Sequence, residues 1–524
     1  MSLRTRPRVA VVLGAALALA GVPAGSVPGA GPPPEPPGCV SSGPLLRYVV
    51  LFEPGAPEPA AATAVTAACA ATTVYYPQIG VVVATSADPG FAARMGAGRA
   101  YSAQAEALAP SPGQPAATGH RGSARGGLVA LQEPQTPALR AHRVPTADRS
   151  AEQWDMALIH APQARAIDPG SPEVTVGVLD SGVDATQPDL TRAVDSASSA
   201  GCLTGKPDQD PRAWSPTTSG HGTHVAGTIA AADDGRGITG VAPGVRLASI
   251  KVVDDEGFIY PEYAICGFMW AAQHHIRIAN SSYSVDPWLL TCSDVAGQSV
   301  VHEALRRAVQ YATSQGVLTV AAAGNDRLDL ADPRQDPHSP DNAARPKPRP
   351  VDDHCHVLPA QLPGVVAVSS VGPDGIKSSF SSYGLGVVGV AAPGGDRSQR
   401  PAASSSGCVL STIPGGYGYA CGTSMAAPHV SGVAALLASS RPDAGPRELA
   451  ELLTEQADPL PCPARYDPDG DGDATATCTG GSVNSFTGHG MVDALKAVTS
   501  KPDGAVAPPA ADAPAADVAL RPAA

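Results

Sequence analysis

The chain contains few aromatic residues and no excess of positive charge, and both features narrow the class of protein. Of its 524 residues, 4% are aromatic whereas 43% are hydrophobic. This composition predicts a globular core rich in alanine and valine rather than a disordered chain. The formal net charge of −13 argues against nucleic-acid binding, which relies on a basic surface. The cysteines show none of the paired spacings typical of metal sites.

Long apolar runs are also missing. Three arginines precede an apolar stretch from Val9 to about Ala20, and the small residues Val22-Pro-Ala24 follow it. This pattern predicts a secretory signal peptide over residues 1–24. A membrane-spanning helix needs about 20 apolar residues, so we expect no membrane anchor and an extracellular location.

Ten cysteines fit export to an oxidising space. Cys39 and Cys69 lie in the N-terminal part, and eight cysteines follow residue 200. Sequence does not fix their connectivity. Close spacing favours the pairs Cys408–Cys421 and Cys462–Cys478, and the pairs Cys202–Cys266 and Cys292–Cys355 would then follow by elimination.

A carboxylate stands at the end of a predicted buried strand. The run Glu173-Val-Thr-Val-Gly-Val-Leu179 is apolar and rich in β-branched residues, which is typical of a buried parallel strand. Asp180 follows it, at the strand end where open α/β sheets build their sites. A buried carboxylate needs a partner, and an imidazole N–H would serve. The alternative interpretation is a helix-capping Asp.

A histidine opens the next motif, His221-Gly-Thr-His224-Val-Ala-Gly. The small residues after Gly222 predict a closely packed helix. A zinc-protease helix would need two histidines four residues apart with an adjacent Glu, and neither feature is present. The motif therefore does not predict a zinc site, and its residues alone leave either histidine as a candidate base.

A serine stands at the start of an apolar helix predicted from Met425 to Ala438. Pro428 is tolerated only in the first turn, so it predicts a helix that begins close to Ser424. The Ser424 N–H would then lie at the positive end of the helix dipole. The structural alternative is a plain N-cap serine.

A side-chain amide follows another predicted strand, in Gly316-Val-Leu-Thr-Val-Ala-Ala-Ala-Gly324-Asn325. An Asn325 donor beside the Ser424 N–H would form an oxyanion hole, and one such donor contributes roughly 3 kcal/mol to transition-state stabilisation. The alternative is an Asn in a turn.

Taken together, the order Asp180, His221, Asn325, Ser424 with these flanking residues resembles the subtilisin-like serine peptidases (subtilases, peptidase family S8) over roughly residues 150–500. The resemblance implies an α/β fold with a doubly wound, mostly parallel sheet flanked by helices. It also implies a triad of Asp180, His221 and Ser424 with Asn325 as the oxyanion donor. In this family the first histidine of the motif is the base, so His221 would be the base and His224 a structural histidine. The related sedolisins use Ser with Glu and Asp, and the His-Gly-Thr-His block argues against them.

The resemblance also implies a substrate-binding segment. Ser282, Tyr283 and Ser284 follow Asn280 and would form an edge strand that pairs with the substrate backbone. Ser284 occupies a position where the family usually has Gly. Ala322, Ala323 and Gly324 would form the opposite wall of the primary specificity pocket.

The rest of the chain divides by composition. Residues 40–100 predict a small α+β unit that resembles the inhibitory propeptide of subtilases. Residues 101–150 are rich in Gly, Pro, Ala and Gln and predict a flexible linker, which is a preferred site of cleavage. The catalytic domain would span 151–500, followed by a disordered Pro/Ala-rich tail over 501–524.

The chemistry needs no cofactor, although a structural calcium ion is possible. Asp467, Asp469, Asp471 and Asp473 place carboxylates at alternate positions, as in the first half of a calcium loop. Cys478 stands where the late Glu of such a loop would be, so a solvated acidic turn is the alternative.

We therefore expect a secreted serine endopeptidase that is made as a zymogen. It would act on protein or peptide substrates through an acyl-enzyme, bind its own propeptide as an inhibitor, and be a monomer. The alternatives are a dedicated processing peptidase for one precursor and a protease-like binding module.

Overall fold

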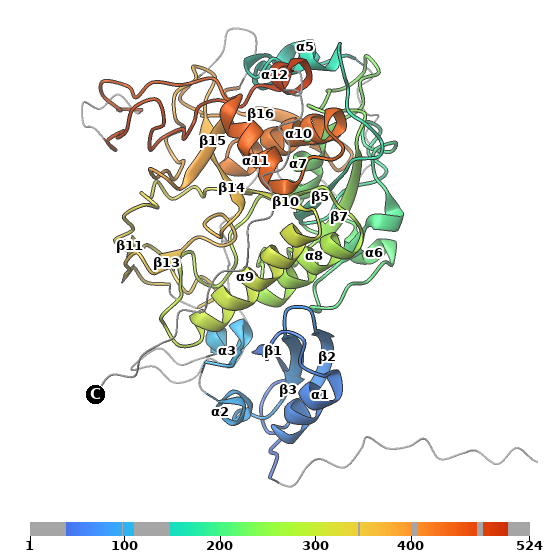
Figure 1. The fold of residues 1–524 in the computed structure, drawn as a ribbon, viewed down its shortest axis with the longest axis vertical. Coiled ribbons are helices and arrows are strands. Elements are labelled where there is room, and N and C mark those ends of the chain that lie inside the picture. The colour runs from blue at the N-terminus through green and yellow to red at the C-terminus, as the bar shows by residue number, and fades with distance from the viewer. Residues whose placement is uncertain are drawn as a thin grey trace, which may run out of the picture.

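The computed structural model describes residues 38–96, 98–108, 147–343, 346–399, 406–468 and 475–500. They form a small N-terminal unit and a larger α/β unit (Figure 1). The predicted signal peptide, most of the predicted linker and the predicted C-terminal tail lie outside the described residues.

The N-terminal unit is a four-stranded antiparallel sheet with helices packed against it. The strands lie in the order β2 (Ala71–Tyr76), β3 (Val81–Ser86), β1 (Leu46–Leu51) and β4 (Ala100–Tyr101). The helices are α1 (Glu58–Ala67), α2 (Phe91–Met95) and α3 (Ala103–Leu108). The expected α+β pattern is present. The unit nevertheless extends past residue 100, because β4 pairs with β1 and α3 follows it.

The larger unit is built on a seven-stranded sheet in which every neighbouring pair is parallel. The order is β15 (Val388–Pro393), β14 (Val365–Val371), β10 (Leu318–Ala322), β8 (Ile278–Ser281), β5 (Thr175–Asp180), β7 (Arg246–Lys251) and β6 (Ala200–Gly201). The chain starts in the middle with β5, fills one side, and then returns to β8 on the other side. The predicted doubly wound sheet is confirmed, and its topological switch point lies between β5 and β8.

Helices cover both faces of this sheet, because successive side chains of each strand point to opposite faces. Val178 packs with the core that contains α7 and α10, whereas Leu179 packs with the core that contains α8 and α9. The first face carries α4 (Trp154–Leu158), α5 (Ala161–Arg165), α7 (His221–Ala230), α10 (Thr423–Ser440), α11 (Pro446–Glu455) and α12 (Ala494–Thr499). The second face carries α8 (Pro261–Gln273) and α9 (Gln298–Ser314).

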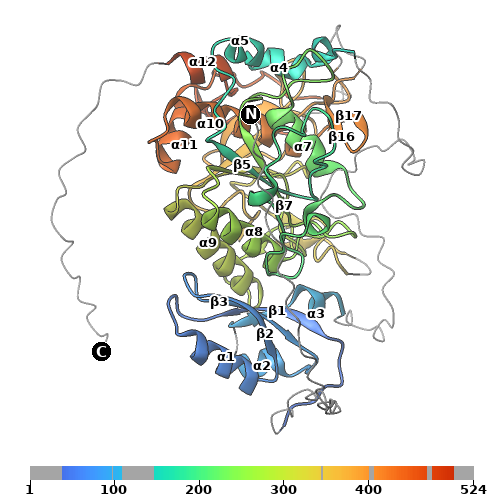
Figure 2. The ribbon, with the colours of Figure 1, turned by 90° about the vertical axis from the view of Figure 1, so that its right-hand side faces the viewer.

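The N-terminal unit packs on α8 and α9, as both views of the ribbon show (Figures 1 and 2). The second core of the large unit continues into the N-terminal unit through Val49, Val81, Val83 and Tyr101. The two units therefore share one apolar interface.

Five disulfides lie in the described part of the chain, and the four favoured pairs are all present. The fifth, Cys39–Cys69, lies within the N-terminal unit. The Cys408–Cys421 bridge joins the ends of the hairpin formed by β16 (Val409–Ile413) and β17 (Gly416–Ala420).

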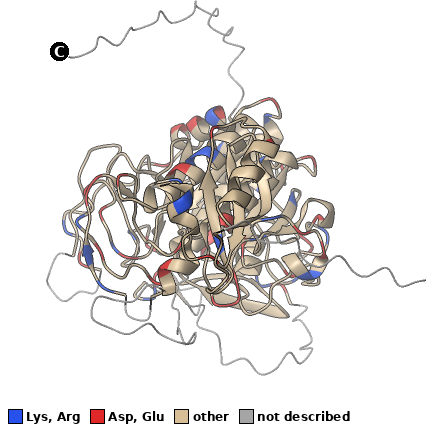
Figure 3. Cartoon of the chain, turned by 90° about the horizontal axis from the view of Figure 1, so that it is seen from below, with Lys and Arg blue, Asp and Glu red and all other residues tan. Residues whose placement is uncertain are grey.

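The remaining elements are short. They are α6 (Pro211–Trp214), β9 (Thr291–Cys292) paired with β13 (Cys355–His356), and β11 (Gln335–Asp336) paired with β12 (Arg349–Pro350). Basic and acidic residues are interspersed along the cartoon of Figure 3. Among the described helices, none has the length and apolarity needed to cross a membrane.

Candidate active site

Asp180 and His221 form a buried pair at the carboxyl end of the sheet. Asp180 is the last residue of β5, and His221 is the first residue of α7. Nδ1 of His221 lies 2.8 and 2.9 Å from the two carboxylate oxygens of Asp180. Both residues are about 1% exposed, so the carboxylate has the partner that its burial requires. This bond places the N–H on Nδ1 and leaves Nε2 free to accept a proton.

Ser181 fixes the start of α7 against this strand end. Its hydroxyl accepts a hydrogen bond from the Gly222 N–H at 3.0 Å and donates to the Ser219 carbonyl at 3.2 Å. The Asp180 carboxylate also accepts from the Ser181 N–H at 2.7 Å. These bonds orient both partners of the Asp180–His221 pair.

Ser424 is the second residue of α10, as predicted from its motif. Pro428, however, lies inside the helix and not in its first turn. Proline has no N–H to donate to the carbonyl four residues earlier, which belongs to Ser424. The Ser282 hydroxyl supplies the missing donor at 2.9 Å. The helix therefore continues through Pro428 because a side chain from another element replaces the lost bond.

Ser282 also accepts a hydrogen bond from the Ser424 hydroxyl. Ser424 Oγ donates to the Ser282 carbonyl at 3.1 Å, and within the described residues it forms no hydrogen bond to His221. The helices α7 and α10 pack side by side on one face of the sheet.

Ser282 and Tyr283 lie just past the end of a strand and not within one, and their pairing with a substrate backbone stays a prediction. The strand β8 ends at Ser281 and lies between β5 and β10 in the middle of the sheet. Ser282 is fully buried beside Ser424, and Tyr283 packs its ring into the core shared with α8 and α9. Ser284 is partly exposed.

Asn325 lies beside the start of α10. Its Oδ1 accepts from the Thr423 N–H at 2.9 Å and from the Thr423 hydroxyl at 3.0 Å. These two bonds direct Nδ2 away from Thr423. A Cβ atom built on Gly422 would lie 3.6 Å from the Ser424 N and 3.8 Å from the Asn325 Nδ2. The Asn325 Oδ1 would lie 3.7 Å from the same Cβ, so the Asn325 amide group and the Ser424 N are both close neighbours of Gly422.

The residues predicted to form the opposite wall, Ala322 to Gly324, lie at the end of β10 and directly after it. Ala322 ends the strand, Ala323 is buried, and Gly324 has a φ of 103°, which favours glycine. The Gly324 N–H donates to the Thr423 hydroxyl at 3.2 Å, so this wall is joined to the helix that carries Ser424. Asp326 follows Asn325, and burial raises the pKa of its carboxyl group.

His224 is held as a structural residue, as expected. Its Nε2 lies 3.2 Å from both the Val409 and the Gly418 carbonyl oxygens, which belong to the β16–β17 hairpin. Burial, together with the nearby His221, lowers the pKa of His224 to about 3. The ring is therefore neutral and joins α7 to the hairpin.

Asp467 is the one member of the possible calcium loop that the structure describes, whereas Asp469, Asp471 and Asp473 lie outside the described residues.

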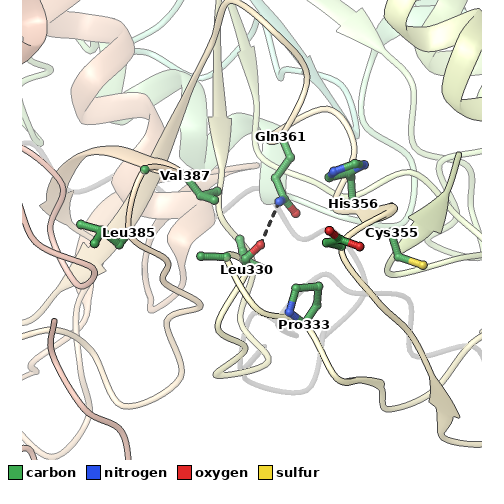
Figure 4. A pocket seen from close by; sticks show the side chains of 10 residues that line it. Leu330, Pro333, Cys355, His356, Gln361, Leu385 and Val387 are labelled. Carbon is green, nitrogen blue, oxygen red and sulfur yellow. Dashed lines mark hydrogen bonds between the residues drawn. The ribbon is translucent and has the colours of Figure 1, made fainter. Parts of the chain in front are cut away.

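A separate open cavity of about 260 Å³ lies beside the Cys292–Cys355 bridge (Figure 4). Leu330, Pro333, His356 and Leu385 line it, and Gln361 spans its wall with a 3.1 Å bond to the Leu330 carbonyl. The cavity contains none of the predicted site residues.

Comparison with known proteins gives consistent matches. The sequence pattern of the subtilase family matches residues 171–490. Fervidolysin of Fervidobacterium pennivorans is 34% identical over 325 residues, which cover 59% of this chain and 40% of fervidolysin. Subtilisin NAT of Bacillus subtilis subsp. natto is 33% identical over 55% of this chain and 61% of its own length. The match to the subtilisin of Bacillus pumilus, at 33% identity, covers 85% of that protein.

Solved structures give the same fold. The epidermin leader peptide processing serine protease of Staphylococcus aureus aligns with a TM-score of 0.60 and 19% identity, covering 88% of this chain and 99% of that one.

Proposed function

The chain belongs to the subtilase family, and we propose that it is a serine endopeptidase that hydrolyses peptide bonds through an acyl-enzyme. The observation that carries this proposal is the arrangement at the carboxyl end of the sheet. A buried carboxylate orients an imidazole, and the serine at the start of α10 lies close to the Asn325 amide, which would join the Ser424 N–H as an oxyanion donor. A binding module has no physical need for all of these groups.

The proposed chemistry starts with proton transfer from Ser424 Oγ to Nε2 of His221. The oxygen attacks the substrate carbonyl carbon, and the carbonyl π electrons move to its oxygen. The resulting oxyanion accepts hydrogen bonds from the Ser424 N–H and the Asn325 side chain. Asp180 stabilises the imidazolium. The oxyanion then collapses, the C–N bond breaks, and His221 gives its proton to the leaving amine. In the second half, water gives a proton to His221 and attacks the acyl carbon. The bond to Ser424 Oγ then breaks, and His221 returns the proton to this oxygen.

We also propose where the substrate binds and that the reaction needs no cofactor. Ser282 to Ser284 and Ala322 to Gly324 would flank the substrate residue that precedes the cleaved bond. The steps above use only side chains and backbone groups of this chain, and calcium near Asp467 would be structural.

The N-terminal unit is proposed to be an inhibitory propeptide of a secreted zymogen. It covers α8 and α9, and its last strand and helix contact two loops of the large unit. The Trp288 indole donates to the Tyr101 hydroxyl at 3.0 Å, and the Asn342 side chain donates to the Ala103 carbonyl at 2.8 Å. Trp288 lies four residues after Ser284, so the end of the unit contacts the segment next to the proposed substrate wall. A tethered inhibitor has a high effective concentration.

A fluorophosphonate probe tests the assignment without knowledge of the substrate. It should label the processed wild-type protein covalently and should fail to label Ser424→Ala. This variant should keep the fold, because the substitution removes only one oxygen atom. Wild-type protein that remains unlabelled after linker cleavage would overturn the proposal. A peptide-library cleavage profile would then separate a general endopeptidase from a dedicated processing enzyme.

A further inference from the structure

Side chains hold three consecutive residues around the proposed nucleophile. Asn325 accepts from the Thr423 N–H, and the Ser282 hydroxyl donates to the Ser424 carbonyl. The third contact is made by Nδ1 of His429, which lies 2.8 Å from the Met425 carbonyl oxygen. Ser282 and Asn325 belong to strand ends of the sheet. His429 belongs to α10 itself, so it can fix Met425 only if its own ring is held from outside the helix.

The ring of His429 is held by Asp155 of α4. Nε2 of His429 lies 3.0 Å from Asp155 Oδ2, and both side chains are 0% exposed. The other oxygen, Oδ1, has no hydrogen-bond partner among the described residues, so this carboxyl group depends on the histidine.

The hydrogen-bond pattern fixes the orientation of the ring. A backbone carbonyl can only accept, so Nδ1 carries a proton and donates to Met425. One further proton must lie between Nε2 and Asp155, either as imidazolium with carboxylate or as neutral ring with carboxylic acid. A flipped ring would place carbon atoms against both oxygens and lose both bonds.

Such a pair is not explained by stability alone, because a buried charged pair is often no more stabilising than apolar side chains of similar volume. We propose that Asp155 and His429 are positioning residues for Ser424. They hold the Met425 carbonyl, and thereby the turn that orients the Ser424 hydroxyl and N–H. This inference rests on the proposed peptidase function.

Asp155 lies close to the start of the large unit. It is the second residue of α4, and the described chain resumes at residue 147 after the linker. The segment that would become the new N-terminus after linker cleavage therefore contacts the turn at Ser424 through His429.

The test compares Asp155→Ala and Asp155→Asn in the full chain after linker cleavage. Alanine removes the partner of Nε2, and small displacements of reacting groups lower turnover on the order of 100-fold. We expect Asp155→Ala to lower kcat and the fluorophosphonate labelling rate by about that factor, with little change in KM. Asparagine can donate from Nδ2 to Nε2 of a neutral ring, so Asp155→Asn should restore most of the rate.

A second His–Asp pair provides the control. Nδ1 of His160 lies 3.0 Å from Asp493 Oδ2, away from the start of α10. His160→Gln should leave kcat and the labelling rate unchanged, whatever it does to the melting temperature. If Asp155→Ala is not recovered folded, Asp155→Leu keeps the volume and removes the same bond.

A wild-type kcat and labelling rate in a folded Asp155→Ala or Asp155→Leu protein would overturn the inference and leave a purely structural pair. Equal losses in Asp155→Asn and Asp155→Ala would also contradict it, because asparagine preserves the orientation of the ring. Failure of the wild-type protein to react with the probe would instead refute the proposed function.

Discussion

At the scale of single residues, Ser282 makes two contacts with Ser424. Its hydroxyl donates to the Ser424 carbonyl, and its carbonyl accepts from the Ser424 hydroxyl. The Asn280 side chain in turn donates to the Ser282 hydroxyl at 2.9 Å. The nucleophile is thus joined to the end of β8 through both its backbone and its side chain.

Ser282→Ala should therefore destabilise the fold. It leaves the Ser424 carbonyl and the Asn280 amide without a buried partner, and an unsatisfied buried polar group costs about 1–3 kcal/mol. Denaturant unfolding of the inactive Ser424→Ala background, with and without Ser282→Ala, measures this loss. An unchanged free energy of unfolding would show that water or a nearby group replaces the hydroxyl.

Asn325→Ala should lower kcat by about 100- to 1000-fold and change KM little, because the lost donor interacts with the developing oxyanion. Alanine also removes the acceptor for Thr423. Asn325→Asp keeps that acceptor but replaces the Nδ2 donor with a charged oxygen that repels the oxyanion, so a kcat defect at least as large as that of Asn325→Ala assigns the effect to the oxyanion. A defect confined to KM would indicate a structural turn instead. Steady-state kinetics on one peptide substrate distinguishes these outcomes.

The sequence predicted the residues of the site better than their contacts. Asp180, His221, Asn325 and Ser424 lie in short motifs that also specify the local fold, so each was located from its flanking residues. The Ser282 bond and the Asp155–His429 pair join segments that are more than 140 residues apart. One signal was available: Pro428 within an apolar helix implies an outside donor for the Ser424 carbonyl.

At the scale of elements, α7 is joined to the β16–β17 hairpin by one neutral histidine. His224 donates from Nε2 to two hairpin carbonyls, and its Nδ1 has no partner among the described residues. Protonation would place a charge in a fully buried site between α7 and the hairpin.

This histidine predicts a loss of stability in acid. Burial lowers the pKa of His224 to about 3, whereas an unfolded histidine titrates near 6.5. Between those values the unfolded chain binds a proton that the folded chain does not. The titration of His224 therefore costs no stability above about pH 6.5. As the pH drops from there toward 3, the free energy of unfolding falls by up to about 1.4 kcal/mol per pH unit.

Urea unfolding of Ser424→Ala protein at several pH values from 7 to 4 measures this slope, and the same series with His224→Gln removes the titrating group. The difference between the two slopes isolates His224 from the carboxylates, which also titrate in acid. Identical slopes would contradict the assignment.

Element types were predicted more reliably than element environments. The β-branched runs predicted the strands, since their side chains are buried on both faces. The same pattern does not reveal which strands are neighbours in the sheet. The sequence therefore did not show that β8 lies in the centre of the sheet, directly before the segment expected to pair with substrate. The helix after Ser424 was predicted from its apolar composition, but the position of Pro428 within it depends on a contact with β8.

At the scale of the whole molecule, two arginines join the N-terminal unit to the large unit. Arg307 of α9 donates to the Phe52 and Ile79 carbonyls at 2.7 and 3.1 Å. Arg47 of β1 donates to the Leu203 carbonyl at 2.7 Å and lies 3.9 Å from the buried Glu262. The α+β pattern of residues 40–100 predicted the small unit, but not that it packs on α8 and α9, because those helices have an apolar face toward the sheet in either case.

Maturation is the prediction that depends on both units together. The last described helix of the N-terminal unit, α3, ends at Leu108, and the described chain resumes at residue 147. Cleavage should occur in the predicted linker between them, because its Gly-, Pro-, Ala- and Gln-rich composition is typical of cleaved linkers. The active form should begin within that range, and Ser424→Ala should remain uncut if the chain processes itself. N-terminal sequencing of both proteins after secretion decides the point.

The Arg307 contact allows a test of how the N-terminal unit is released after cleavage. After cleavage the N-terminal unit is held only by its interface, so Arg307→Ala should release it more readily and shorten the lag before activity appears. Arg306→Ala is the matched control, because Arg306 bonds to Glu303 and Gln310 of its own helix. An active protein that still carries residues 38–108 covalently attached would refute the maturation model while leaving the peptidase proposal intact.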